Sequence, residues 1–125
     1  MTKSRIVSVL AAAAALLFAM SASADPKKSA ELVAKGKASY ETNCAACHGE
    51  KGLGDGEAGA ALDPKPRNIV KDGFKLGLKP AQIHAMLKKG IDGSTMVSFE
   101  HLSDDELWAL SYYVLELRAG GKSKK

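Results

Sequence analysis

Two cysteines and a histidine stand within five residues of each other in the run Cys-Ala-Ala-Cys-His, at Cys44, Cys47 and His48. Residues three apart on a helix or tight turn share a face, so both thiols can meet one edge of a flat prosthetic group. The thiols can add to the vinyl groups of haem, and the imidazole that follows can bind its iron. The run is therefore typical of covalent, c-type haem attachment, and it predicts a fold that surrounds one haem.

Three other uses of these cysteines remain open from the sequence. They could form a disulfide, or a thioredoxin-like redox pair, although no strand–helix–strand pattern accompanies them. A zinc site would need four ligands, and only His84 and His101 remain as candidates for the fourth.

The N-terminus has the pattern of a secretory signal peptide. A basic start at Lys3 and Arg5 precedes an apolar run over residues 6–20, and small residues at 22–24 provide a cleavage site. The run is shorter than the roughly 20 residues of a membrane span, although an uncleaved anchor remains the alternative. We expect residues 1–24 to be removed, the protein to reside in the periplasm, and no stable membrane insertion after cleavage.

Composition suits a small domain built around a prosthetic group. About 100 residues follow the predicted cleavage site, a size at which a protein buries a limited core. Only three Phe, three Tyr and one Trp serve the whole chain. Such a core gains from a large apolar cofactor.

Charge is distributed unevenly along the chain. Residues 51–89 hold eight basic and four acidic side chains, whereas residues 90–118 hold six acidic side chains and a single basic one, Arg118. A charge dipole of this kind can orient a protein as it meets a partner. No basic face interleaved with aromatic residues is present, which argues against nucleic-acid binding.

Hydrophobic periodicity and turn residues predict an all-α fold. We expect helices over residues 29–47, with Gly36 and Tyr40 on its packed face, and over residues 80–90, between Pro80 and a terminal glycine. A third helix begins with a capping box of Ser103 and Glu106, buries Leu107, Leu110, Val114 and Leu117, and ends before Gly120. The segments between are loops, with residues 63–67 extended by two prolines. The domain is expected to span residues 25–119, followed by a basic flexible tail, 120–125.

A haem iron bound by His48 needs a second axial ligand or an open position. Methionine sulfur raises the reduction potential and fills the site. Met96 lies in a loop that can aim its side chain inward, whereas Met86 lies in a helix where packing is the expected role. We therefore predict Met96 as ligand, with His84 and His101 as the alternatives.

The order of these motifs resembles small monohaem class I cytochromes c. The resemblance is carried by Gly36 and Tyr40, the CAACHG run, residues 63–68 (DPKPRN), residues 90–96 (GIDGSTM), Phe99, and residues 102–108 (LSDDELW) through Tyr113. It implies three to five helices around one covalent haem c with His48 and Met96 as axial ligands. Family members usually carry proline directly after the ligand methionine, and Val97 stands there in this chain.

The resemblance also implies roles for particular residues. Gly36 and Tyr40 would cross the last helix near Leu110 and Tyr113. A proline carbonyl would face the ring N–H of His48, with Pro66 preferred over Pro64. Arg67 would reach a haem propionate.

The expected function is a diffusible, monomeric carrier of single electrons between periplasmic redox partners, and not an enzyme. Lysines of residues 51–89 would meet an acidic docking surface on the partner. The alternatives are a haem subunit of a multi-component reductase or dehydrogenase, and a ligand-binding, sensing or peroxidatic haem protein.

Overall fold

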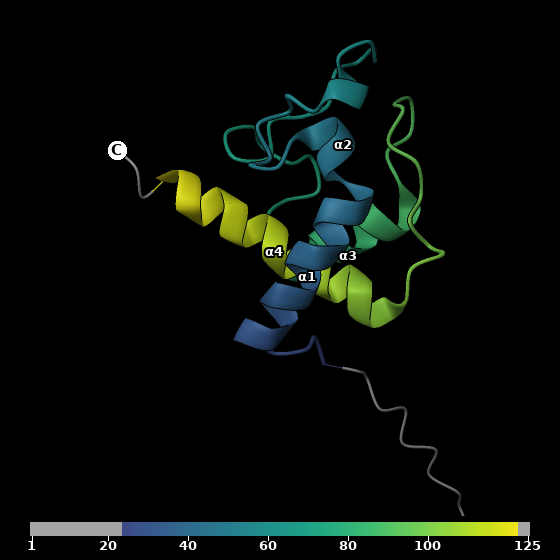
Figure 1. The fold of residues 1–125 in the computed structure, drawn as a ribbon. Helices are drawn as coiled ribbons and strands as arrows, with labels where there is room; N and C mark the ends of the chain where they lie inside the picture. The colour runs from purple at the N-terminus through teal and green to yellow at the C-terminus, as the bar shows by residue number, and fades with distance from the viewer. Residues whose placement is uncertain (1–23, 123–125) are drawn as a thin grey trace, which may run out of the picture.

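A computed structural model describes residues 24–122, and within that range the secondary structure is entirely helical (Figure 1). The predicted signal peptide lies outside the described residues except for its last one. The elements are α1 (Ala30–Asn43), α2 (Ala45–His48), the 3₁₀ turn η1 (Glu57–Gly59), α3 (Pro80–Lys89) and α4 (Asp104–Lys122). The all-α prediction is confirmed.

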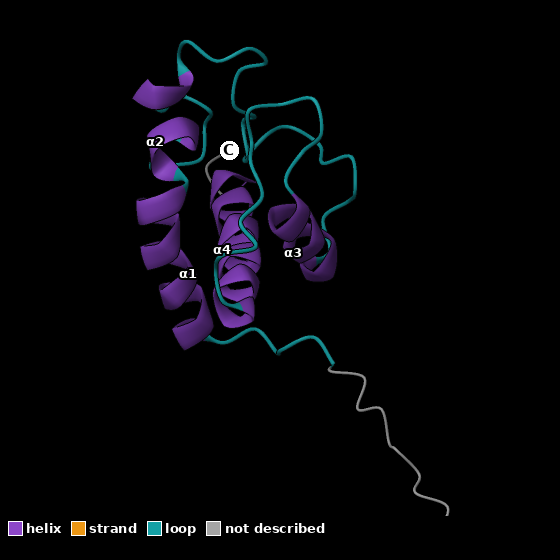
Figure 2. Ribbon diagram, turned by 90° about the vertical axis from the view of Figure 1, so that its right-hand side faces the viewer, coloured by secondary structure: helices purple, strands orange, loops and turns teal. Residues whose placement is uncertain are grey.

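The arrangement of the helices places α4 in the centre. Helix α1 lies along one side of α4, and α3 lies on the other side (Figure 2). The short helix α2 continues from the end of α1, and most of the loops gather at that end of the molecule. The Cys-Ala-Ala-Cys-His run therefore stands where the loops converge.

Helices α1 and α4 touch at a glycine. A Cβ atom on Gly36 would lie 2.1 Å from the carbonyl oxygen of Ala109 and 2.9 Å from Cβ of Tyr113, so only glycine permits this approach. One turn on, Tyr40 is fully buried, with its ring centroid 5.2 Å from that of Tyr113. The hydroxyl of Tyr40 donates a hydrogen bond to the carbonyl of Gly49 at 2.7 Å. The crossing expected at Gly36 and Tyr40 is present.

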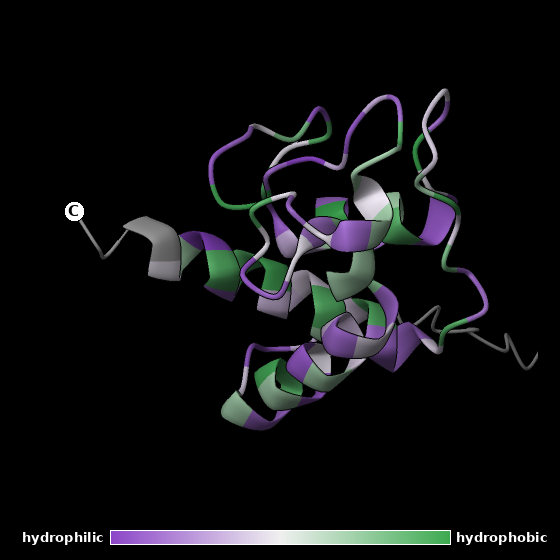
Figure 3. Cartoon of the chain, turned by 45° about the horizontal axis from the view of Figure 1, so that its top comes forward, coloured by the Kyte–Doolittle hydropathy of each residue, from purple (hydrophilic) through white to green (hydrophobic). Residues whose placement is uncertain are grey.

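The core lies between the helices. Its buried members include Ile83 and Leu87 of α3 and Leu107, Leu110 and Val114 of α4. Burial of each such side chain contributes about 1.5–3 kcal/mol to folding. The helices in Figure 3 carry both hydrophobic and hydrophilic residues, as expected when one face packs inward and the other meets water.

Local signals set most helix ends. Ser29 caps α1, accepting a hydrogen bond from the amide of Leu32 at 3.1 Å. Ser103 and Glu106 form the predicted capping box, with each side chain accepting from the other residue's backbone amide. Pro80 opens α3, and Gly90, at φ +79°, ends it.

Two helix boundaries differ from the prediction. The helix expected over residues 29–47 is divided at Cys44, which adopts φ −124° and ψ −37°. Helical hydrogen bonds continue on both sides of Cys44, because its amide donates to Tyr40 and its carbonyl accepts from the amide of His48. The break therefore redirects the chain without leaving backbone groups unpaired. At the other end, α4 continues through Gly120 and Gly121 to Lys122, since each glycine weakens a helix by only about 1 kcal/mol.

Within residues 24–122, no helix combines the length and apolarity that crossing a membrane requires.

Candidate functional site

All six site residues predicted from the sequence line one cavity of about 340 Å³: Cys44, Cys47, His48, Pro66, Arg67 and Met96. They come from three separate parts of the chain, namely the α1–α2 junction, the extended segment after η1 and the loop between α3 and α4. The apolar side chains of Leu62, Pro64, Ile91, Val97 and Phe99 complete the walls. The fold therefore assembles one largely apolar chamber with a few polar groups, the usual composition of a cofactor site.

His48 is oriented by a backbone carbonyl. Its Nδ1 lies 3.0 Å from the carbonyl oxygen of Arg67, and because a carbonyl only accepts, the proton lies on Nδ1 and Nε2 is free to bind a metal. Burial lowers the pKa of His48, opposed by this hydrogen bond, and the Arg67 charge lowers it further. The imidazole is thus neutral and available as a ligand at neutral pH.

The carbonyl that faces His48 was predicted one residue too early. We expected it from Pro66, with Pro64 as competitor, and the structure assigns it to Arg67. Pro66 packs instead beside η1, where its Cγ would lie only 2.4 Å from a Cβ atom on Gly59. That contact sets the direction of the extended segment and presents the next carbonyl to the ring.

Cys44 and Cys47 are free thiols, each partly buried beside the cavity. Burial raises the pKa of Cys44 to about 12, and the charge of Cys47 adds to this. The disulfide alternative is not what the structure shows. Among residues 24–122 no three His, Cys, Asp or Glu side chains are grouped to hold a metal ion, so the zinc alternative gains no support.

Met96 is held in the cavity wall by its own loop. Its amide donates to Oγ of Ser94 at 3.1 Å, and its carbonyl accepts from the amide of Ile91 at 3.1 Å. A Cβ atom on Gly90 would lie 2.7 Å from the amide nitrogen of Ser98, so glycine lets the loop fold back on the end of α3. The loop is closed by the hydrogen bond from the amide of Phe99 to the carbonyl of Leu87, at 2.9 Å.

The alternative ligands lie elsewhere. Met86 packs against the hydrophobic core. His84 stacks on Trp108 and lies 2.9 Å from a carboxylate oxygen of Asp104, and the exposed His101 lies beside Phe99. None of the three side chains lines the cavity.

The side chain of Arg67 turns toward its own segment. Its guanidinium donates to the carbonyl of Gly73 and lies 5.9 Å from the ring centroid of Phe74. The guanidinium of Arg118 lies 5.2 Å from the same ring, and this residue of α4 was considered only for its charge in the sequence. Its position four residues after Val114, on the buried face of α4, is the signal that could have identified it.

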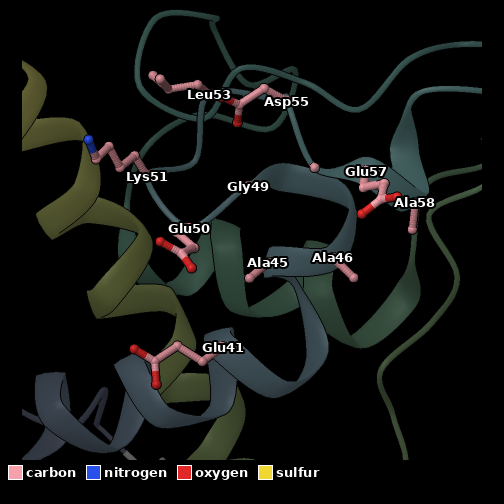
Figure 4. Close-up of a pocket in the computed structure, with 11 residues that line it drawn as sticks. Glu41, Ala45, Ala46, Gly49, Glu50, Lys51, Leu53, Asp55, Glu57 and Ala58 are labelled. Carbon is pink, nitrogen blue, oxygen red and sulfur yellow. The ribbon is translucent and has the colours of Figure 1, made fainter.

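A second hollow, of about 930 Å³, lies beside α2 (Figure 4). It is lined by the carboxylates of Glu41, Glu50, Asp55 and Glu57 and by Lys51, and by none of the six predicted site residues. The haem site predicted from the sequence therefore coincides with the smaller, more enclosed cavity.

The residues of that cavity fit haem c. Two free thiols stand beside an imidazole whose Nε2 is available, and Met96, on a separate loop, lines the same cavity. Imidazole and thioether are suitable axial ligands for haem iron, and apolar walls suit the macrocycle.

Comparison with known proteins identifies the family. Residues 31–114, more than half of the chain, match the family described as cytochrome C oxidase, cbb3-type, subunit III. Among solved structures, a chain of the reducing HAO-like protein complex of Kuenenia stuttgartiensis is similar, with 32% identity and a TM-score of 0.70. The match covers 76% of this chain and 47% of that one. No curated protein matches.

The structural match spans about half of the similar chain, so the likeness concerns a domain rather than that whole protein. The family match, the helical fold and the cavity with its Cys-Ala-Ala-Cys-His run agree with one another. The chain belongs to the family of cbb3-type cytochrome c oxidase subunit III and is a small cytochrome c, a haem-binding electron-transfer protein.

Proposed function

We propose that the protein is an exported monohaem cytochrome c that carries single electrons between redox partners in the periplasm. One haem would be attached through Cys44 and Cys47, with His48 and Met96 as axial ligands. The observation that carries the proposal is the gathering of these four side chains around one cavity. Bound haem supplies the one-electron chemistry, and the chain supplies the attachment, the ligands and the apolar enclosure.

The chain's own residues favour electron carriage over catalysis. With both His48 and Met96 engaged, no position would remain open for a substrate. The loop that bears Met96 is closed by two hydrogen bonds to α3, from the amide of Phe99 to the carbonyl of Leu87 and from Oγ of Ser98 to the carbonyl of Lys88. Transfer between proteins then needs only a brief encounter at a small interface.

An absorption spectrum tests the ligand set. Protein expressed with export to the periplasm should keep its haem after acid–acetone extraction, and the oxidised form should show the weak far-red band of an iron–methionine bond. Retained haem with a high-spin spectrum, or carbon monoxide binding to the reduced protein, would instead favour a ligand-binding or peroxidatic role. Colourless protein would overturn the proposal.

Export is tested separately. Mass spectrometry of the mature protein should find Asp25 as the first residue, and cell fractionation should place the protein in the periplasm. An intact N-terminus in the membrane fraction would indicate an uncleaved anchor.

A second candidate is a haem subunit of a multi-component reductase or dehydrogenase. The observation that favours it is that the matched family is named for an oxidase subunit and the similar structure is a complex. Size-exclusion chromatography of a native periplasmic extract separates the two. A haem-containing peak at the size of a monomer supports the carrier, and co-elution with a larger redox enzyme supports the subunit.

Partner recognition would depend on charge. Lys65 lines the cavity and is exposed to solvent, where it would meet an acidic surface on a partner. Electron exchange with the partner should slow as ionic strength rises, because salt screens exposed charges. A rate that does not change with salt would remove this part of the proposal.

A further inference from the structure

Arg118 is a cation inside the protein. Arg118 lies on the buried face of α4, and only 8% of its surface is exposed to solvent. Arginine is rarely buried so deeply without partners for its charge and its N–H groups. Other groups of the fold must therefore satisfy the charge and the N–H groups of Arg118.

The partners of Arg118 are backbone carbonyls of one loop segment. One guanidinium nitrogen, Nη1, donates to the carbonyl of Ile69 and, at 2.6 Å, to the carbonyl of Asp72. The same guanidinium lies 5.2 Å from the ring centroid of Phe74, a cation–π distance. Arg118 thus fastens residues 69–74 to α4 at three points.

The fastened segment is a stiff unit. Oδ1 of Asn68 accepts from the amides of Val70 and Lys71, each at 3.0 Å, and the amide of Asn68 donates to the carboxylate of Asp72. The amide of Ile69 donates to the carbonyl of Gly52 at 2.7 Å. A displacement at Ile69 is therefore passed to its neighbours rather than absorbed.

The carbonyl that orients His48 lies just before this segment. Arg67 stands two residues before Ile69, and its carbonyl oxygen lies 3.0 Å from Nδ1 of His48. A carbonyl in this position fixes the ring and makes the imidazole a better electron donor to a metal. The connection from Arg118 to His48 thus runs through one short stretch of main chain.

We propose that Arg118 is a positioning residue for His48, acting through residues 67–74, of which it holds Ile69, Asp72 and Phe74 against α4. The inference rests on the proposed function, because it concerns His48 as a ligand of haem iron. Removing the guanidinium of Arg118, with its two hydrogen bonds from Nη1 and its contact with Phe74, releases residues 67–74, weakens the hydrogen bond from Nδ1 of His48 to the Arg67 carbonyl and changes the donor strength of His48.

The test uses the haem-bound protein and the variant Arg118→Lys. Lysine keeps the positive charge, so a direct electrostatic effect on the haem is largely retained, but its shorter side chain lacks the planar guanidinium that reaches the Ile69 and Asp72 carbonyls and lies over Phe74. The reduction potential should rise, because a weaker imidazole donor stabilises oxidised iron less. Hydrogen exchange at the amide of Ile69 should accelerate roughly tenfold to a hundredfold, as expected for loss of hydrogen bonds to a charged group.

Tyr112→Phe is the matched control. Tyr112 is also in α4 and 8% exposed, and its hydroxyl donates to a backbone carbonyl, that of Pro26, at 2.6 Å. The control removes a comparable tether from a segment that does not contact His48. Its reduction potential and the exchange of the Ile69 amide should match the unmodified protein.

The outcomes separate the two proposals. An Arg118→Lys protein that exchanges faster at Ile69 but keeps the original potential would overturn the positioning role and leave the cytochrome function intact. An equal shift of potential in Tyr112→Phe would also overturn it, since the effect would be one of general loosening. Unmodified protein without covalent haem would overturn the proposed function itself.

Discussion

Nδ1 of His48 and the carbonyl oxygen of Arg67 lie 3.0 Å apart, joining α2 to the extended segment that follows η1. The contact uses only main-chain chemistry on the Arg67 side. The guanidinium of the same residue is directed to the Gly73 carbonyl and the Phe74 ring. Arg67 therefore supports His48 with its backbone and its own segment with its side chain.

Met96→Ala should leave haem covalently attached but lower the reduction potential. The thioether stabilises reduced iron, and axial ligands move haem potentials over a range of about 0.8 V, so a fall of roughly 0.1–0.3 V is expected. Redox titration and the far-red band measure the effect. Met86→Ala is the control, since Met86 packs on the core and does not line the cavity. An unchanged potential in Met96→Ala would exclude Met96 as a ligand.

Gly90→Ala should weaken the iron–methionine band without releasing haem. A Cβ atom at position 90 would lie 2.7 Å from the Ser98 amide nitrogen and 2.8 Å from the Val97 carbonyl carbon, so the loop bearing Met96 must move. Gly93→Ala is matched in backbone conformation, at φ +74° against +79°, but its Cβ would meet open space. The far-red absorbance of the two variants is compared, and equal losses would show that the strain of a positive φ alone is responsible.

Gly36→Ala should destabilise the fold by about 1–3 kcal/mol, the usual cost of overpacking. The added methyl would overlap the Ala109 carbonyl, which is backbone and cannot rotate away. Urea denaturation monitored by circular dichroism gives the free energy of unfolding. Gly120→Ala, in an exposed turn of α4 with nothing within 4 Å, should be neutral or stabilising by up to about 1 kcal/mol. Gly36→Ala protein of unchanged or greater stability would contradict the backbone contact between α1 and α4.

The protein should lose stability above pH 10, and Tyr40 should account for part of the loss. Burial raises the pKa of the Tyr40 hydroxyl above its usual range, with smaller contributions from the charges of Cys44, Tyr113 and Asp55. Because the folded state holds this proton more tightly than the unfolded state, the stabilisation is complete below about pH 10 and declines by about 1.4 kcal/mol per pH unit above it. Denaturation midpoints measured between pH 9 and 11 give the slope.

Tyr40→Phe is the comparison for that measurement. It removes the titrating group, so its stability should fall less steeply with pH than that of the unmodified protein. At neutral pH it should be less stable by about 1–3 kcal/mol, because the buried carbonyl of Gly49 loses its hydrogen-bond donor. Parallel curves for the two proteins would show that Tyr40 does not titrate in this range.

Much of the fold was predictable because its signals are local. Pro80 and Gly90 delimit α3. Ser103 and Glu106 form a capping box, a local sequence signature of a helix start, and so mark the beginning of α4. Gly36 could be recognised as a point of close approach, since glycine inside a helix is otherwise unfavourable. Each of these inferences needed only a few neighbouring residues.

What could not be predicted depends on contacts between distant segments. The choice of Arg67 over Pro66 as the carbonyl partner depends on how the extended segment packs against Gly59. The role of Arg118 depends on carbonyls more than forty residues away in sequence. The break at Cys44 has no breaker residue of its own, because neither glycine nor proline stands there. Such features are set by tertiary packing.

The contact between Gly36 and Ala109 has a consequence for how this chain can change over evolution. Where two helices pack through side chains, a substitution on one helix is usually accommodated by repacking on the other. The distance between the two helix axes then changes. Here the separation is set by main chain against main chain, so neighbouring side chains can vary while the spacing of the two helices stays constant. The Cys-Ala-Ala-Cys-His run follows directly from the end of α1, so its distance from α4 is fixed by the same contact.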